Sequence, residues 1–283
     1  MSSVETTFNS QPIAKPTTHK MGRLRKELNA ILAIASRDVI LAVKSPSAWA
    51  FNLIMPLMMM GIFGGSLSQN MSSGLGFDYK QFMMIGMAVN TLFMVTVTRI
   101  TALVEEREQN LTQEIFVAPI SRYSIIVAKI IGASFSALTQ LIGVFLVGLL
   151  MGIDFTFADA LQIFAIAPIV CLIAGSLGVI FIGFVSDPKV ADMGSAMLVM
   201  PQMFLSGAMI PINHSTGVLN FLAHIMPMTY AIDLVRAIFY YGTPTYEAIV
   251  IRSPFENIVI LAIFFIVFMV IGTFMFTRKG RNR

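Results

Sequence analysis

The chain has 283 residues, of which 56% are hydrophobic and only 12% are charged, and its mean hydropathy is +0.79. A soluble domain carries about 25% charged residues, so this composition excludes a soluble domain of useful size and predicts an all-α membrane protein with several spans. The formal net charge of +4 does not indicate a nucleic-acid partner, because the distribution of charge along the chain matters more than its sum. A single cysteine, Cys171, excludes an intrachain disulfide.

The first 46 residues precede the apolar runs. Residues 1–21 are polar and rich in Ser, Thr and Pro, which predicts a disordered cytoplasmic tail, and they lack the apolar core of a cleavable signal peptide. Residues 22–46 carry apolar side chains at helical spacing and basic side chains on the other sides, as in an amphipathic helix that lies in the membrane interface. Pro46 ends this helix. Residues 47–283 form the predicted transmembrane domain.

Six apolar runs are long enough to cross a bilayer, which takes roughly 20 residues. Arg99 lies inside the second run near its end, where its side chain is expected to snorkel to the interface rather than to line a transport path. Gly61 and Gly65 in the first run could form a close-packing face between helices. The six predicted spans are residues 49–67, 81–103, 124–153, 160–185, 190–210 and 257–276.

A charged segment, residues 105–122, separates the second and third runs. Asn110 is placed as the N-cap of a short helix, and Pro119 stops that helix after two turns. A helix this short is not stable alone in water, so it needs a partner surface, either lipid headgroups or another protein. One side of the helix carries the apolar residues Leu111, Ile115 and Ala118.

Residues 211–257, between the fifth and sixth runs, are too polar to span a membrane, but they contain two short apolar pieces separated by Pro227. Asp233 and Arg236 are three residues apart and are expected to pair on one helix face. The region is therefore predicted to form short helices at, or dipping into, the far membrane surface.

The Lys and Arg residues are distributed unevenly between the two sides that these spans define. Sixteen of the 19 fall on the side that holds both termini and residues 105–122, and three fall on the other side. Because Lys and Arg are in excess in cytoplasmic loops, both termini and residues 105–122 are predicted to be cytoplasmic. The short helices after the fifth run are then external.

The sequence offers no catalytic, cofactor-binding or metal-binding motif. It has no Gly-Lys dipeptide, and hence no phosphate-binding loop, and its three histidines are scattered without a carboxylate pattern. No run carries the paired carboxylates of an ion-driven carrier. A transporter of this kind would take its energy from elsewhere, through residues 105–122. Some of its 21 methionines could line a soft path for apolar ligands.

Three motifs, in order, resemble those of type-2 ABC transporter permeases. Residues 104–129 resemble the family's E-R-E-x-G-T-L-E … P-x-S-R … K region, with Asn110 where many members have Gly. Residues 204–211, FLSGAMIP, resemble its LSG … P segment, and residues 226–236, MPMTYAIDLVR, resemble its P-x-T/S-Y … R segment. The likeness covers nearly the whole chain after the N-terminal tail.

The resemblance implies that two permease chains, identical or closely paralogous, pair with two separate ATPase subunits, so that the ATP site lies on the partner. Residues 105–122 would be the coupling helix that docks in a cleft of the ATPase, and residues 22–46 the interfacial connecting helix. The residues implied in ATPase coupling are Glu105, Glu106, Arg107, Glu108, Asn110, Leu111, Thr112, Glu114, Ile115, Phe116, Pro119 and Arg122. Those implied in an external gate are Gly207, Pro211, Pro227, Tyr230, Asp233 and Arg236.

The family exports drugs, lipids, polysaccharides and some ions. A short external region without an added soluble domain resembles daunorubicin-type drug and lipid exporters of the cell membrane, which implies a hydrophobic or amphipathic substrate. Clustered external tyrosines are a hint for a glycan exporter instead, although interface belts give the same pattern. A stand-alone channel or ion-coupled carrier is a competing class, and a receptor or assembly factor is a third. Charged or polar rings within the spans would indicate the channel or carrier, and only Arg99 offers itself. A neighbouring reading frame that encodes an ABC ATPase would argue against the receptor or assembly factor.

Overall fold

The computed structural model describes residues 23–108, 122–213 and 215–279. All regular elements in these ranges are helices, as predicted. The predicted tail, residues 1–21, and most of the predicted coupling helix, residues 109–121, lie outside the described residues. The helices are α1 (Arg23–Val43), α2 (Pro46–Leu75), α3 (Tyr79–Glu108), α5 (Arg122–Leu150), α6 (Phe157–Phe184), α7 (Pro188–Leu205), α8 (Gly217–Ile225), α9 (Pro227–Phe239), α10 (Tyr246–Ile249) and α11 (Pro254–Lys279).

Proline and capping residues set several of the helix boundaries. Pro46 lies in the first turn of α2, where its missing N–H leaves no helical hydrogen bond unmade. Thr156 and Asp159 form a capping box at the start of α6, with reciprocal hydrogen bonds of 3.2 and 2.8 Å. The Asp187 carboxylate accepts two backbone N–H hydrogen bonds at the start of α7. Local sequence therefore fixes the turns between consecutive helices.

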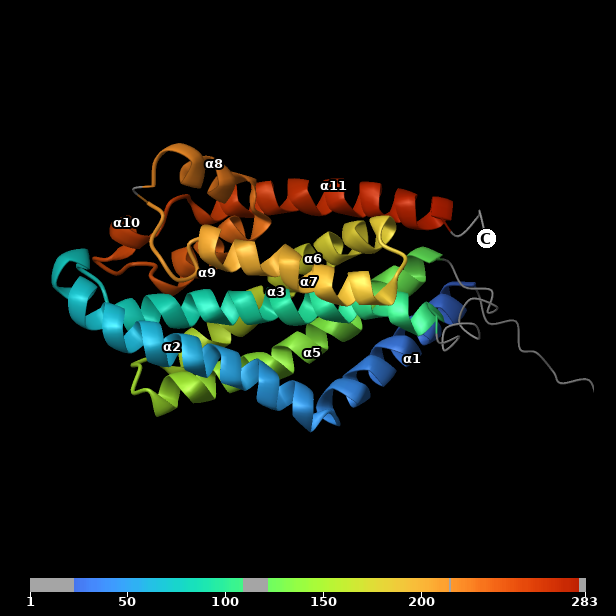
Figure 1. The fold of residues 1–283 in the computed structure, drawn as a ribbon, viewed down its shortest axis with the longest axis horizontal. Coiled ribbons are helices and arrows are strands. Elements are labelled where there is room, and N and C mark those ends of the chain that lie inside the picture. Colours follow the sequence, from blue (N-terminus) through green and yellow to red (C-terminus); the bar gives the residue numbers. More distant parts are fainter. Residues whose placement is uncertain (1–22, 109–121, 214, 280–283) are drawn as a thin grey trace, which may run out of the picture.

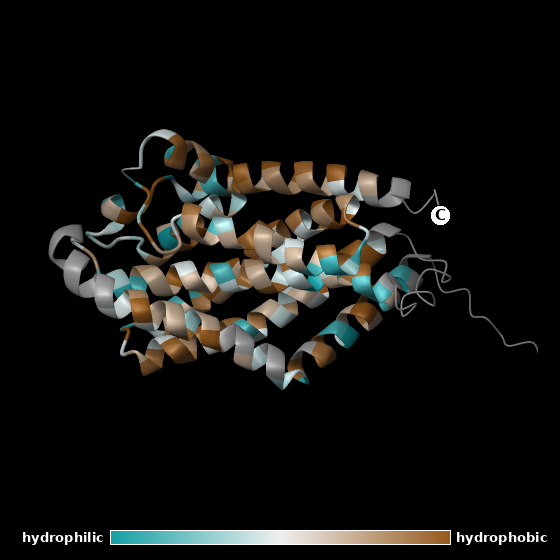
Figure 2. Ribbon diagram, in the orientation of Figure 1, coloured by the Kyte–Doolittle hydropathy of each residue, from teal (hydrophilic) through white to brown (hydrophobic). Residues whose placement is uncertain are grey.

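α3 runs through the middle of the bundle, as Figure 1 shows. It packs against α2, α5, α6 and α7, and its side chains Phe82, Met87 and Phe93 are fully buried. Of the 18 consecutive residues that make up the most apolar part of α3, 78% are buried inside the protein. The same fraction is 17% for Tyr246–Met275, the candidate span that contains most of α11. α3 is therefore an inner helix. α11 is an outer helix that lies along α6, and it carries apolar residues along most of its length (Figure 2).

Length and apolarity identify fewer spanning helices than the six predicted runs. Among the described residues, α3, α5, α6 and α11 meet both criteria, and the number is five if α8 and α9, bent by 83° to each other, count as one broken span. α2 contains only a shorter apolar stretch, Ile54–Gly65, and α7 has 18 residues, including Lys189 and Asp192. The count of six is therefore not confirmed by these criteria, although α2 and α7 both pack along α3.

α7 ends at Leu205, whereas the predicted fifth run continues to Ile210. Gly207 has a φ of +83°, a left-handed conformation that glycine adopts without the steric cost of a Cβ. The chain turns there into a non-helical segment, residues 206–212, which lies against α3. The backbone of Ala208 in this segment comes so close to Gly86 of α3 that a Cβ on Gly86 would overlap the Ala208 carbonyl group.

α1 has two different sides. Ile34 and Ala35 are buried where α1 packs on α5, and a Cβ on Gly132 of α5 would lie 3.3 Å from the Ala35 Cα. Leu28 and Leu32, in contrast, are 56% and 65% exposed. The contact of this exposed apolar side with the membrane interface stays a prediction. The side that packs on protein was not predicted.

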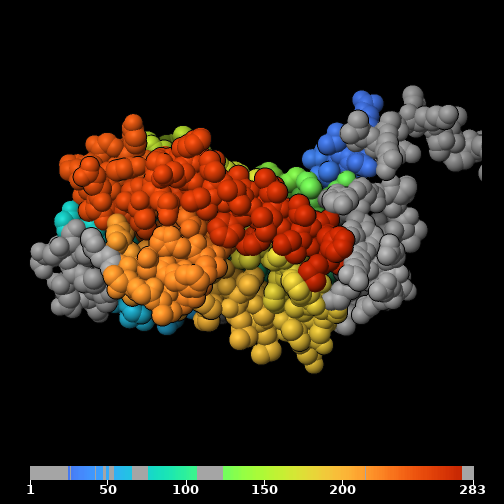
Figure 3. Space-filling model, turned by 90° about the horizontal axis from the view of Figure 1, so that it is seen from above, coloured from blue at the N-terminus to red at the C-terminus, as the bar shows by residue number. Residues whose placement is uncertain are grey.

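The helix ends are sorted between the two ends of the bundle (Figure 1). The start of α1, the end of α3, the start of α5 and the end of α11 lie at one end. α8, α10 and the turn between α2 and α3 lie at the opposite end. The assignment of both termini and residues 105–122 to the cytoplasm stays a prediction from the Lys and Arg count. Figure 3 shows α11 and α8 from above, lying over the rest of the bundle.

Gly86→Ala is predicted to destabilise the chain, because its Cβ would lie 2.7 Å from the Ala208 carbonyl carbon. Overpacking of this kind costs about 1–3 kcal/mol, and it should lower the midpoint of thermal unfolding of the purified chain in detergent. Gly61→Ala is the matched control, since a Cβ on Gly61 meets nothing within 4 Å and alanine favours the helix. Equal unfolding midpoints for the two variants would contradict the close contact between α3 and residues 206–212.

Candidate functional site

The ammonium group of Lys129 lies between two carboxylates near one end of the bundle. Lys129 belongs to α5 and is only 3% exposed. Its Nζ donates hydrogen bonds of 2.9 Å to Oε1 of Glu106, near the end of α3, and of 3.1 Å to Oδ1 of Asp38 in α1. One buried cation therefore joins three helices, two of which flank residues 109–121.

Arg37 adds a second cation. Its Nη2 donates a hydrogen bond of 3.2 Å to the same Oε1 of Glu106, so that two cations face two carboxylates. A hydrogen bond of 3.5 Å from the Ser124 hydroxyl to Oε2 of Glu27 links α1 and α5 a second time. We call Arg37, Asp38, Glu106 and Lys129 the Lys129 cluster.

Burial makes this cluster sensitive to the loss of Lys129, Asp38 or Glu106, whereas Arg37 is 38% exposed. Removing a charge from water costs several kcal/mol, which is offset only when the charge keeps close partners, and Lys129 has two of them. α5 also holds Asp38 by packing, because a Cβ on Gly132 would lie 2.9 Å from the Asp38 Cβ. The end of α3 therefore cannot move without carrying α1 and α5 along or separating buried charges.

Only part of the predicted coupling region falls within the described residues. Glu106 belongs to the Lys129 cluster, and Glu105 is exposed. Arg107 and Glu108 lie in the last turn of α3, and Arg122 lies at the start of α5. The role of these residues in coupling stays a prediction. The other predicted coupling residues lie outside the described residues: Asn110, Leu111, Thr112, Glu114, Ile115, Phe116 and Pro119.

The motif of residues 104–129 ends at Lys129, and Arg37 is one of the basic side chains of the predicted helix at residues 22–46, but neither pattern indicated Asp38. A signal for Asp38 was present. Asp38 follows Ile34 by four residues and Ala35 by three, so its side chain lies on the same helix face as theirs. That face is buried in the structure. A carboxylate on an apolar helix face indicates a buried cation partner, because an unpaired buried charge is too costly.

At the opposite end of α3, the buried side chain of Arg236 from α9 holds the start of α3. Its Nη2 donates hydrogen bonds of 3.2 Å to the carbonyl oxygen of Phe82 and of 3.4 Å to that of Ala208. Its guanidinium carbon lies 3.4 Å from the centroid of the Phe82 ring, a cation–π contact. The Tyr79 hydroxyl donates a hydrogen bond of 2.7 Å to the carbonyl oxygen of Met209. α3, α9 and residues 206–212 are thus held together.

Asp233 and Arg236, both within the described residues, bind different partners instead of forming the predicted ion pair. The Asp233 carboxylate accepts hydrogen bonds of 2.8 Å from the backbone N–H groups of Ile251 and Arg252 and from Nδ2 of Asn257. The three-residue spacing of Asp233 and Arg236 would allow an ion pair, but buried backbone N–H and C=O groups also need hydrogen-bond partners. Both side chains satisfy such groups, and Asp233 thereby attaches α9 to the segment that leads into α11.

The remaining predicted gate residues shape the same region. Pro227 begins α9 at its 83° bend from α8. The Tyr230 hydroxyl spans that bend with a hydrogen bond of 2.8 Å to the carbonyl oxygen of His224. Gly207 turns the chain after α7, and Pro211 lies in the non-helical segment that follows. The six residues therefore gather around α9 and the end of α7, and their role as a gate stays a prediction.

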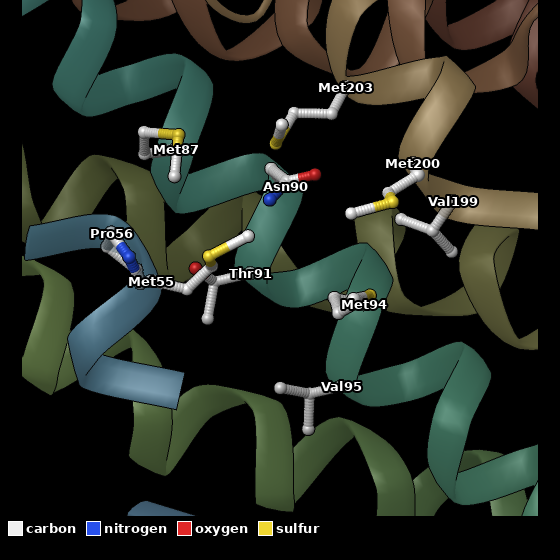
Figure 4. Close-up of a pocket in the computed structure, with 10 residues that line it drawn as sticks. All are labelled: Met55, Pro56, Met87, Asn90, Thr91, Met94, Val95, Val199, Met200 and Met203. Atoms are coloured by element: carbon white, nitrogen blue, oxygen red, sulfur yellow. The ribbon is translucent and has the colours of Figure 1, made fainter. Parts of the chain in front are cut away.

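A groove with an enclosed volume of about 50 Å³ lies between α2, α3 and α7 (Figure 4). Methionine side chains form much of its wall, and none of the ten lining residues is ionisable. Flexible, polarisable thioethers adapt to apolar molecules of different shapes. The lining residues are Met55 and Pro56 from α2, Met87, Asn90, Thr91, Met94 and Val95 from α3, and Val199, Met200 and Met203 from α7.

Lys129→Met is predicted to destabilise the chain by about 3 kcal/mol, because two carboxylates lose their shared cation. The measurement is the midpoint of thermal unfolding in detergent. Lys189→Met is the matched control, since Lys189 is exposed in the first turn of α7, a helix that begins at the same end of the bundle (Figure 1). If the two variants lose the same stability, the Lys129 cluster does not hold the three helices together.

Comparison with known proteins gives the family of this chain. The sequence model of the family described as "ABC-2 type transporter" matches residues 29–240, which include α3, α5, the groove and Arg236. This match confirms the resemblance drawn from the three motifs.

Individual relatives are distant but cover much of the chain. "Putative transport permease ycf38" of Porphyra purpurea is 24% identical over 81% of this chain and 80% of its own length. The protein of the same name from Cyanophora paradoxa is 22% identical over 89% of both chains. "Probable multidrug ABC transporter permease YbhR" of Escherichia coli (strain K12) is 25% identical over 57% of this chain and 44% of its own length. The chain belongs to the ABC-2 type transporter family, whose members are non-enzymatic membrane permeases.

Proposed function

We propose that this chain is the membrane-spanning permease of an ABC exporter that moves a hydrophobic or amphipathic substrate and is driven by a separate ATPase subunit. One observation carries the proposal beyond family membership. The helix α3 bears Glu106 of the Lys129 cluster near one end, lines the groove at its middle and meets Arg236 near its other end. A single rigid element therefore connects the segment expected to meet the ATPase with the candidate substrate path.

In the first step, the ATPase docks on residues 105–122. A two-turn helix is not stable alone in water, so docking supplies its order. Leu111, Ile115 and Phe116 offer apolar area worth about 1.5–3 kcal/mol each when fully buried. Because α3 and α5 flank this segment and Lys129 joins both to α1, a displacement on the ATPase moves three helices together.

In the second step, α3 carries the displacement across the membrane. It has 30 residues, or about 45 Å at 1.5 Å per residue. A shift or rotation of α3 moves Met87, Asn90 and Met94 relative to α2 and α7, and so reshapes the groove. The same motion acts on Phe82, whose carbonyl oxygen and ring both contact Arg236, so the external contacts open in step with the groove.

The proposal includes six spans, with α2 and α7 as the first and the fifth. α7 packs on α3, and its polar side chains Ser195 and Gln202 are buried. Met193 and Met197 are 70% and 75% exposed. Two of the polar residues of α7 thus lie inside the protein while apolar residues face outward, and its exposed charged residues, Lys189 and Asp192, lie in its first two turns. A second permease copy is expected to pair with this one in the cell membrane, with both termini in the cytoplasm.

A glycan substrate has weaker support than an apolar one. Two of the external tyrosines, Tyr230 and Tyr240, are buried, so they offer no free ring face to a sugar. Tyr241 and Tyr246 pack edge to face with their ring centroids 6.4 Å apart, at the end of the bundle away from the Lys129 cluster. The groove, in contrast, is lined by thioether and aliphatic side chains, which suit apolar ligands.

A cytoplasm-only reporter fused after Phe276 is predicted to be active, because sixteen of the 19 Lys and Arg residues lie on the side of both termini. A periplasm-only reporter at the same position should be inactive. The matched fusion is placed in the loop after Tyr241, where the two reporters should show the reverse pattern. External activity after Phe276 would contradict the even number of spans or their orientation.

Leu111→Asp and Phe116→Ala are predicted to reduce export at least about tenfold without lowering the amount of chain in the membrane. Each change removes apolar area from the docking surface, while insertion depends on apolar runs that neither change touches. The measurement is copurification of the ATPase together with export of a fluorescent amphiphile by cells that express both subunits.

Gln113→Asp is the matched control for these variants. It adds a carboxylate to the same predicted helix, on the side opposite Leu111. It should keep both ATPase binding and export. If Leu111→Asp and Phe116→Ala reach normal membrane levels, retain the ATPase and still export, residues 105–122 are a surface loop and the proposed coupling is wrong.

A further inference from the structure

Asn90 is a polar residue in an otherwise apolar part of the groove. It lies in α3, is 9% exposed and lines the groove between α2 and α7. Its Oδ1 is buried and has no hydrogen-bond partner among the described residues. In Figure 4 this oxygen points away from the α3 backbone toward Met200 and Met203 of α7.

An unsatisfied carbonyl oxygen at this place calls for a partner from outside the chain. About 90% or more of buried polar groups in proteins have a hydrogen-bond partner. Within a membrane there is little water to satisfy such a group. The methionines around Asn90 offer only weak sulfur acceptors and no donor. Thr91 also lines the groove and has a hydroxyl donor, but it makes no hydrogen bond to Oδ1. A ligand in the groove is the remaining source of a donor.

We propose that Asn90 is a specificity-determining residue of this groove, which selects amphipathic molecules that present a hydrogen-bond donor to Oδ1. The donor is a hydroxyl, an amide N–H or an amine N–H on an otherwise apolar, often aromatic, molecule. The inference rests on the proposed function, because it names the chemical class of substrate that the groove accepts.

The lining of the groove argues for neutral ligands and against anions. None of the ten lining side chains could balance a full charge, and burying an unpaired charge is costly. The negative end of the Asn90 carbonyl dipole repels an anion further. The groove is narrow, with an enclosed volume of about 50 Å³, and its flexible methionines allow it to widen around an apolar body of variable shape.

The test compares two neutral fluorescent probes that differ by one methyl group. N-phenyl-1-naphthylamine carries a single N–H donor, and its N-methyl derivative carries none. Binding of each is titrated with the full-length chain in phosphatidylcholine nanodiscs, with empty nanodiscs as the blank. The N–H probe is expected to bind wild-type chain about three- to tenfold more tightly than the N-methyl probe, the effect of one hydrogen bond.

Asn90→Leu is expected to weaken binding of the N–H probe by the same factor and to leave the N-methyl probe within about twofold of wild type. Unchanged binding of the N-methyl probe shows that the groove is intact. Gln140→Met is the matched control, because Gln140 is a buried amide of α5 that also has an unpartnered oxygen but does not line the groove. That variant should keep the preference for the N–H probe.

The donor could come from an exported amphiphile or from a lipid. Phosphatidylcholine has no hydrogen-bond donor in its headgroup, whereas phosphatidylethanolamine has an ammonium group. Repeating the titration in nanodiscs that contain phosphatidylethanolamine separates the two sources. A lower affinity for the N–H probe, with no change for the N-methyl probe, assigns the donor to the lipid. An unchanged preference assigns it to the exported molecule.

Three results would overturn the inference. They are equal binding of the two probes by wild-type chain, binding of neither probe, and an Asn90→Leu variant that keeps the preference for the N–H probe. Each of these results leaves the proposed function standing if cells with the ATPase still export an amphiphile that needs residues 105–122. If export of the amphiphile does not depend on residues 105–122, the proposed function is wrong even when both probes bind as expected.

Discussion

The ammonium group of Lys129, held between the carboxylates of Asp38 and Glu106, is the interaction on which the arrangement of the chain depends. It joins the end of α3, the start of α5 and the first helix, which also packs along α5 through Ile34 and Ala35. Because the charges are buried, the free energy of separating them is large. The helices on both sides of residues 109–121 are therefore coupled to each other before any partner binds.

α3 extends this coupling through the bundle. Its side chains are buried on nearly all sides, so that it can move only with its neighbours or by sliding against them. Contacts at its far end are equally specific, with Arg236 on Phe82 and the Ala208 backbone against Gly86. Between these ends lie the methionines and Asn90 of the groove. A helix held at both ends and open to a cavity at its middle is suited to convert movement of a docked protein into a change of cavity shape.

Features that depend on local residues could be predicted, and features that depend on distant residues could not. The helices, the break at Pro46, the bend at Pro227 and the family motifs all follow from short stretches of sequence. The cluster of Lys129 and Asp38 joins residues 91 positions apart, and no local pattern specifies that pairing. The Asp233–Arg236 pair fitted the helical spacing, but buried backbone groups of other segments took both side chains.

The measurement that tests this account most directly is the effect of nucleotide on ligand binding in the assembled transporter. The affinity of N-phenyl-1-naphthylamine is compared with and without a non-hydrolysable ATP analogue, in complexes built with wild-type or Lys129→Met permease. The account predicts at least about a fivefold nucleotide-dependent change for wild type and little change for the variant, with ATPase binding retained in both. A variant that keeps the full nucleotide response would show that the Lys129 cluster does not transmit movement from the ATPase to the groove.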